Sequence, residues 1–105
     1  MSRVERCPAF EAVAIPAEVL EAQQVQWDVL IDAYLTQAAR VGTRYAASVF
    51  LDRAGLIADG TTVATPEVKA VEERQGFVLL QSLCGNDFYV ITNWLVDSER
   101  LHVCS

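Results

Sequence analysis

Two strand-like runs in the second half of the chain constrain its fold more than any other feature. They read "FVLLQSL" (residues 77–83) and "FYVITNW" (residues 88–94), and the turn-forming stretch "CGND" separates them. Runs of this kind around Gly and Asn are typical of a β-hairpin. With a two-residue loop at 85–86, Leu79 is expected opposite Thr92. The sequence therefore predicts an antiparallel hairpin over residues 77–94.

Both faces of this predicted hairpin are apolar. Successive side chains of a strand point to opposite faces. One face would carry Phe77, Leu79, Leu83, Phe88, Val90 and Trp94, and the other Val78, Leu80, Tyr89 and Ile91. Because apolar faces must be covered, we expect helices, an N-terminal arm or another copy of the chain to pack on the two sides.

The stretch from residue 16 to residue 41 has the period of an amphipathic helix. Pro16 suits the first helical position, and Gly42 suits the left-handed cap beyond the last turn. Apolar residues recur at intervals of three, four or seven: Leu20, Trp27, Ile31, Tyr34, Ala38 and Val41. We therefore expect one long helix of roughly 25 residues here, preceded by an irregular arm over residues 1–15.

The rest of the chain is expected to add a second hairpin, a short helix and a closing strand. Residues 43–51 alternate between apolar and polar, and residues 56–64 are expected to pair with them as an irregular strand. In residues 65–76, Thr65 suits a helix cap, Pro66 the first helical position and Gly76 the end of a helix. The last stretch, "LHVC", is expected to form an edge strand.

These elements predict a single α+β domain over residues 1–105. Their order is α-β-β-α-β-β-β, with a mostly antiparallel sheet of about five strands. A chain of 105 residues fits one compact domain. Its hydrophobic fraction of 52% is high for such a size, which favours a homodimer or another partner protein that covers one face.

The charge of the chain disfavours several classes of ligand, and its apolar runs and cysteines indicate where the protein is located. The formal charge is −6, from 14 acidic and 8 basic residues, which disfavours nucleic acid and anionic membranes as ligands. No apolar run approaches the length of a membrane helix, and the first residues do not suit a secretory signal. Three cysteines are an odd number, so reduced thiols and a cytoplasmic location are expected.

The end of the chain, "LHVCS", raises the question of a metal site. On a strand, His102 and Cys104 would point to the same face, and Cys84 is a third possible ligand. Cys7 or Asp87 would be needed as a fourth ligand for tetrahedral zinc. No CxxC or HxxxH spacing is present, however, so the expectation is that the protein binds no metal and no other cofactor.

A cysteine nucleophile is the second chemical possibility. Cys84 would attack, His102 would act as the base, and Asp87 or Asn86 would orient the base. A reactive thiol needs a lowered pKa, and the neighbouring acid at position 87 acts in the opposite direction. We therefore expect no catalytic residues.

Aromatic and apolar side chains indicate a binding function instead. The interface is expected to include Trp27, Tyr34, Tyr89, Ile91 and Trp94. Core packing is the more common role of aromatic residues at the helical spacing of Trp27 and Tyr34, and a position at the rim of the core is the more common one for Trp94. The sequence thus favours a small, non-enzymatic protein-interaction or regulatory module that forms homodimers. Two alternatives stay open: a cysteine-dependent enzyme or thiol or zinc sensor using Cys84, His102 and Cys104, and a small-molecule-binding domain.

Overall fold

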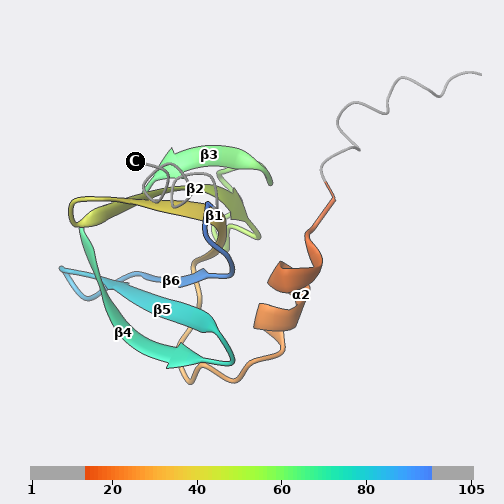
Figure 1. Cartoon of the computed structure of the whole chain (residues 1–105), viewed down its shortest axis with the longest axis horizontal. Helices are drawn as coiled ribbons and strands as arrows, with labels where there is room; N and C mark the ends of the chain where they lie inside the picture. Colours follow the sequence, from red (N-terminus) through yellow and green to blue (C-terminus); the bar gives the residue numbers. More distant parts are fainter. Residues whose placement is uncertain (1–13, 96–105) are drawn as a thin grey trace, which may run out of the picture.

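Two three-stranded antiparallel meanders form a single mixed sheet (Figure 1). The computed structural model describes residues 14–95. The first meander comprises β1 (Ala33–Val41), β2 (Arg44–Phe50) and β3 (Thr61–Ala64), and the second β4 (Val68–Arg74), β5 (Phe77–Ser82) and β6 (Phe88–Ile91). The strand order is β3-β2-β1-β6-β5-β4, and β1 and β6 join the meanders as a parallel pair. The protein is therefore a small, mostly β domain.

The sheet folds over on itself, so that the two meanders face each other as two layers (Figure 1). The link between β3 and β4 holds this shape. The backbone N–H of Thr65 donates to the carbonyl of Tyr45 at 2.8 Å, and that of Val68 donates to the carbonyl of Thr43 at 2.9 Å. These bonds bring the start of β4 to the beginning of β2, which partly closes one end of the fold.

Each side of the sheet has its own apolar core. The core inside the fold contains Ala33, Leu35, Ala38, Tyr45, Ala47, Val49, Val68, Leu80 and Ile91. The core on the outer side contains Val19, Ala22, Val25, Trp27, Tyr34, Phe50, Phe77, Leu79 and Val90. The short helix α2 (Ala17–Gln23) contributes Val19 and Ala22 to the outer core. As expected for the hairpin of β5 and β6, both of its faces are buried.

The predicted long helix is wrong, and with it the α-β-β-α-β-β-β order. Within residues 14–95 the only helix is α2, which stops at Gln23, and Asp28 adopts a left-handed conformation with φ of 67°. The chain then enters β1, whose residues 33–36 are all buried. A central strand that is covered on both faces has no polar alternation, so its apolar residues also fit a helical period. Burial in the sheet outweighs the helix propensity of this Ala- and Gln-rich stretch.

The predicted helix over residues 65–76 is wrong as well, because this stretch contains the edge strand β4. The hydroxyl of Thr65 accepts the backbone N–H of Tyr45 at 3.0 Å instead of capping a helix. Arg74 pairs with Phe77 across a turn in which Gln75 and Gly76 both have positive φ. Such turns match the twist of antiparallel strands, so the glycine ends a strand and begins a hairpin.

The hairpin of β5 and β6 is present, but its register differs from the prediction by two residues. Leu79 lies opposite Val90 and not opposite Thr92. The N–H of Ser82 donates to the carbonyl of Asp87 at 2.9 Å, which closes a loop over residues 83–87. A shift of two residues keeps the side chains within β5 and β6 on their predicted faces, so Phe77, Leu79 and Val90 share one core and Leu80 and Ile91 the other. Two residues outside these strands differ from the prediction: Leu83 is exposed, and Trp94 lies beside Tyr45 of the inner core.

The expected pairing of residues 43–51 with 56–64 holds only in part. β2 lies within the first range, whereas β3 begins at Thr61 and residues 51–60 form a loop.

No helix in the described part of the chain is long and apolar enough to cross a membrane. The arm at 1–13 and the expected closing strand at 101–104 lie outside the described residues.

Candidate functional site

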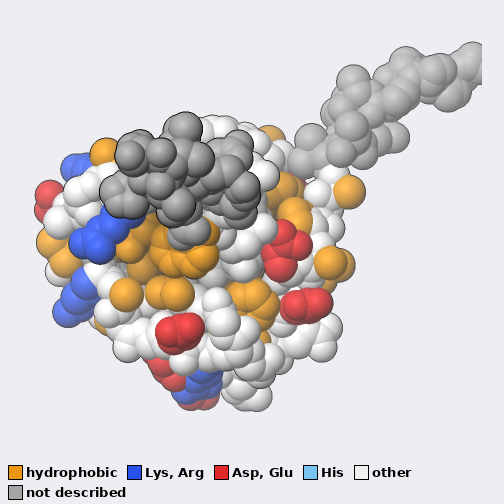
Figure 2. Space-filling view, in the orientation of Figure 1, with side chains coloured by type: hydrophobic (Ala, Val, Ile, Leu, Met, Phe, Trp, Pro, Cys, Tyr) orange, Lys and Arg blue, Asp and Glu red, His pale blue; other side chains and the backbone are white. Residues whose placement is uncertain are grey.

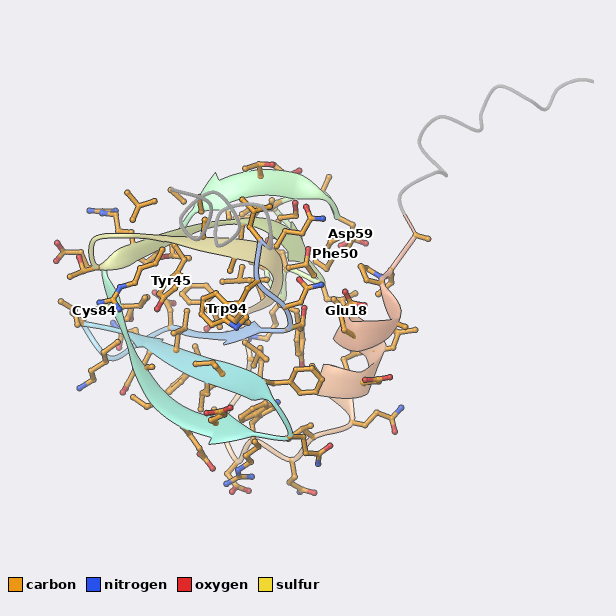
Figure 3. The ribbon with its side chains drawn as sticks, in the orientation of Figure 1. Glu18, Tyr45, Phe50, Asp59, Cys84 and Trp94 are labelled. Carbon is orange, nitrogen blue, oxygen red and sulfur yellow. The ribbon has the colours of Figure 1, made fainter. Side chains whose placement is uncertain are left out.

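Of the residues that were considered for thiol or metal chemistry, the structure places only Cys84, Asn86 and Asp87. Cys84 is exposed on the loop between β5 and β6, at the end of the molecule opposite Glu18 of α2 (Figure 3). His102, Cys104 and Cys7 lie outside the described residues. Among residues 14–95 no group of three or more His, Cys, Asp or Glu side chains is arranged to hold a metal ion.

The thiol of Cys84 has a lowered pKa, contrary to the direction inferred from its acidic neighbour. A hydrogen bond with the hydroxyl of Ser82, at 3.2 Å, is the main cause, and the backbone of Asn86 acts in the same direction. The charge of Asp87 opposes them and is the weaker influence. Local hydrogen bonds to the thiolate thus outweigh the neighbouring carboxylate.

The five predicted interface residues divide into buried and accessible groups. Trp27, Tyr34 and Ile91 are buried in the chain's own two cores. Tyr89 is half-buried on β6, and Trp94 is 38% exposed just beyond it. Only Tyr89 and Trp94 therefore offer surface to a partner in this structure.

Tyr89 and Asp87 line the same cavity, which lies on the inner side of the folded sheet. The cavity has a volume of about 280 Å³ and is formed by β1, β2, β3, the start of β6 and the loops beside them. Its apolar wall consists of Ala33, Leu35, Val49, Ile57, Val63 and Ala64. Small side chains at positions 33 and 64 leave the space that larger ones would fill.

Three carboxylates surround this apolar wall. Asp32 precedes β1, Asp52 follows β2, and Asp87 precedes β6, so the sheet topology brings together residues that are far apart in the sequence. In parallel neighbours, the same ends of both strands lie at one edge, which is why the acids before β1 and β6 meet.

The side chain of Asp32 is fixed by contacts with two segments, the start of β6 and the loop after β2. One carboxylate oxygen accepts the backbone N–H of Phe88 at 2.9 Å, and the other accepts the guanidinium of Arg53 at 2.9 Å. Its backbone carbonyl also accepts the N–H of Arg53 at 2.8 Å. Asp32 therefore holds the loop after β2 against the start of β6.

Asp52 and Asp59 organise that loop from within. Asp52 accepts the backbone N–H groups of Leu56 at 2.8 Å and Ile57 at 3.0 Å. Asp59 accepts the N–H of Leu51 at 2.9 Å. Side chains of Asp that bind nearby backbone N–H groups are a common way to define a turn. The loop thus presents Leu56 and Ile57 in a fixed conformation beside the cavity.

Asp87 differs from the other two acids because its carboxylate has no partner in the described part of the chain. Its backbone N–H donates to the hydroxyl of Ser82 at 3.1 Å, which fixes the main chain. Within residues 14–95, no hydrogen bond or ion pair reaches its carboxylate oxygens. This carboxylate is therefore available to a ligand.

The environment of the cavity raises the pKa of the Tyr89 phenol. Burial raises the pKa of Tyr89 to about 12, and the charges of Asp87 and Asp32 act in the same direction. The hydroxyl is therefore protonated at neutral pH, and the negative field of the cavity disfavours any further negative charge. The site suits a group that is apolar along its length and positively charged at its end.

Comparisons with family models, with curated proteins and with solved structures found no match to this chain.

The sequence singled out Tyr89 as an interface residue and Asp87 as a possible metal ligand or orienting acid, but it did not predict the cavity that they line. Asp32 lies in the range of the predicted long helix, which the structure does not contain, and Asp52 lies in the loop that follows β2. The available signal was the repeated pattern of an Asp at a strand boundary. Without the parallel pairing of β1 and β6, nothing in that pattern indicates that the acids converge.

Proposed function

We propose that this protein is a non-enzymatic interaction module that binds a basic partner protein at the acidic cavity. The observation that carries the proposal is the combination of charge and apolar surface around one opening. Leu56, which is 85% exposed, precedes Ile57 of the cavity lining, and Leu83, which is 56% exposed, begins the loop that ends at Asp87 of the lining. Exposed apolar side chains around a concave site mark interaction surfaces.

The charge of this opening favours a basic partner over a second copy of the chain. Two identical acidic surfaces would bring carboxylates of like charge together, which costs free energy at an interface. The formal charge of −6 also speeds the approach of a basic protein by long-range attraction.

Self-association is proposed for a different face. Figure 2 shows apolar side chains gathered at the centre of one face, where Figure 3, in the same orientation, labels Tyr45 and Trp94. The two rings lie 5.9 Å apart. An aromatic pair of this kind suits the centre of a homodimer interface. The proposal includes a cytoplasmic location, in agreement with the free, exposed thiol of Cys84.

Site-specific photocrosslinking in an extract of the source cell tests the proposed basic-partner site. A photoreactive amino acid is placed at position 56 or 83, and at position 71 as a control. Val71 is also exposed, at 43%, but it lies on the edge strand β4. We expect the same basic protein to be crosslinked from positions 56 and 83 only, and to bind after purification. Equal crosslinking from all three positions, or none, would contradict the proposal.

A further inference from the structure

We infer that the cavity accepts the guanidinium group of an arginine side chain from the partner, an inference that rests on the proposed function. The starting point is the inventory of acceptors. Both oxygens of the Asp32 carboxylate already have partners, one oxygen of Asp52 accepts two N–H groups of its own loop, and both carboxylate oxygens of Asp87 lack a partner among residues 14–95. Asp87 therefore supplies the free carboxylate for the incoming cation.

The aromatic wall of the cavity favours a guanidinium over an ammonium ion. The planar guanidinium stacks on aromatic rings, and it loses less hydration energy than an ammonium ion on burial. Tyr89 follows Asp87 by two residues, so both side chains leave the same face of the chain and line one cavity. A guanidinium can therefore bind the carboxylate through its N–H donors while it lies on the ring.

The chain already shows that a guanidinium fits at the rim of this site. Arg53 donates to Asp32 at 2.9 Å, and its side chain is 55% exposed. It reaches Asp32 from the loop and makes no ion pair with Asp87. The cavity is thus acidic enough for one cation at its rim and retains an unused carboxylate for a second.

The size of the cavity favours one side chain over a free small molecule. Its volume of about 280 Å³ is at the lower limit of the roughly 300–1,000 Å³ typical of small-molecule sites. The methylene groups of an arginine would pack on the apolar wall, which includes Val63 and Ile57. Leu56 and Leu83 would contact the partner's neighbouring residues.

An NMR titration of the purified protein tests this inference. The probes are the N-acetyl amides of arginine, lysine and citrulline, the last of which replaces the guanidinium by a neutral group of similar shape. We expect saturable amide shifts at Ile57, Asp87 and Tyr89 with millimolar affinity for arginine, weaker binding of lysine, and no saturation with citrulline. Asp87→Asn is expected to weaken arginine binding at least fivefold, whereas Glu73→Gln, on the exposed edge strand, leaves it unchanged.

Several outcomes would overturn the inference. These are the absence of saturable shifts, equal binding of citrulline, tighter binding of lysine, or an Asp87→Asn variant that binds arginine normally. If Asp87→Asn does not fold, Tyr89→Leu provides the test, because it removes the stacking surface. This variant must lose more affinity for arginine than for lysine.

The experiments distinguish a failure of this inference from a failure of the proposed function. Without arginine binding, crosslinks from positions 56 and 83 would still support the interaction module. Without those crosslinks, arginine binding would show a small-cation site only.

Discussion

The carboxylate of Asp32 accepts the backbone N–H of Phe88 at 2.9 Å, although 56 residues separate them in the sequence. The N–H of Asp32 in turn donates to the carbonyl of Phe88 at 2.8 Å. These two bonds fix the point at which the two meanders join. They also hold two of the three acids of the cavity at the same end of the sheet.

Replacement of Asp32 should cost more stability than replacement of its ion-pair partner. Asp32→Ala leaves the N–H of Phe88 without its acceptor, so we expect a loss of about 1–3 kcal/mol in the free energy of unfolding. Arg53→Ala removes only an exposed ion pair and should cost less than about 1 kcal/mol. Urea denaturation of both variants measures the difference. Equal losses would show that the ion pair, and not the backbone contact, stabilises the junction.

Tyr89 should ionise at unusually high pH. Burial and the facing carboxylates raise its pKa to about 12, from 10.0 for an ordinary tyrosine. Because the folded-state pKa is the higher one, the associated stability is complete below pH 10 and is lost as the pH rises toward 12. Absorbance titration of wild type and Tyr89→Phe should assign the step. In Asp87→Asn the pKa of Tyr89 should fall, and an unchanged value would mean that Asp87 does not face the ring.

The thiol of Cys84 should react with iodoacetamide faster at neutral pH than an ordinary cysteine. Its pKa is lowered chiefly by the hydroxyl of Ser82, and the thiolate is the reacting species. Ser82→Ala should slow the reaction and also cost about 1–3 kcal/mol, because Asp87 loses the acceptor of its N–H. Asn86→Ala keeps the backbone contact and is the control. If Ser82→Ala reacts at the wild-type rate, the hydroxyl does not set the pKa.

Native mass spectrometry should show a homodimer without added mass. Trp94 is the accessible member of the aromatic pair, so Trp94→Glu should weaken the dimer at least tenfold, or by about 1.4 kcal/mol. Leu20→Glu, at an exposed position on α2, is the matched control and should leave the dimer intact. A wild-type protein that is monomeric at every concentration would contradict self-association, and one zinc per chain would revive the metal-site alternative.

The hairpin of β5 and β6 could be predicted from the sequence because local signals suffice for it. Its apolar runs, its turn and its two buried faces are all properties of neighbouring residues. The strands β1 and β4 could not be recognised in the same way. The first residues of β1 are buried on both faces, so their apolar pattern fits a helix equally well. At β4, the residue types of Thr65, Pro66 and Gly76 occur both at the ends of helices and at the turns beside strands.

The cavity was not predicted from the sequence, although two of its residues were singled out there for other roles. Asp87 and Tyr89 are two residues apart, so their common face follows from the strand assignment. The contributions of Asp32 and Asp52 depend on the parallel pairing of β1 with β6, a contact between distant segments that local patterns do not specify. Cys84 illustrates the same limit, because the hydrogen bond that lowers its pKa comes from the conformation of the loop and not from its composition.

The central claim is tested most directly by calorimetric titration of the purified partner, identified by photocrosslinking, against three forms of this protein. These are the wild type, Asp87→Asn, which removes a carboxylate charge inside the cavity, and Glu73→Gln, which removes one outside it. We expect Asp87→Asn to weaken binding by about tenfold or more, equivalent to about 1.4 kcal/mol, and Glu73→Gln to bind as the wild type does. Equal affinities for all three proteins would contradict the claim that the acidic cavity is the binding site.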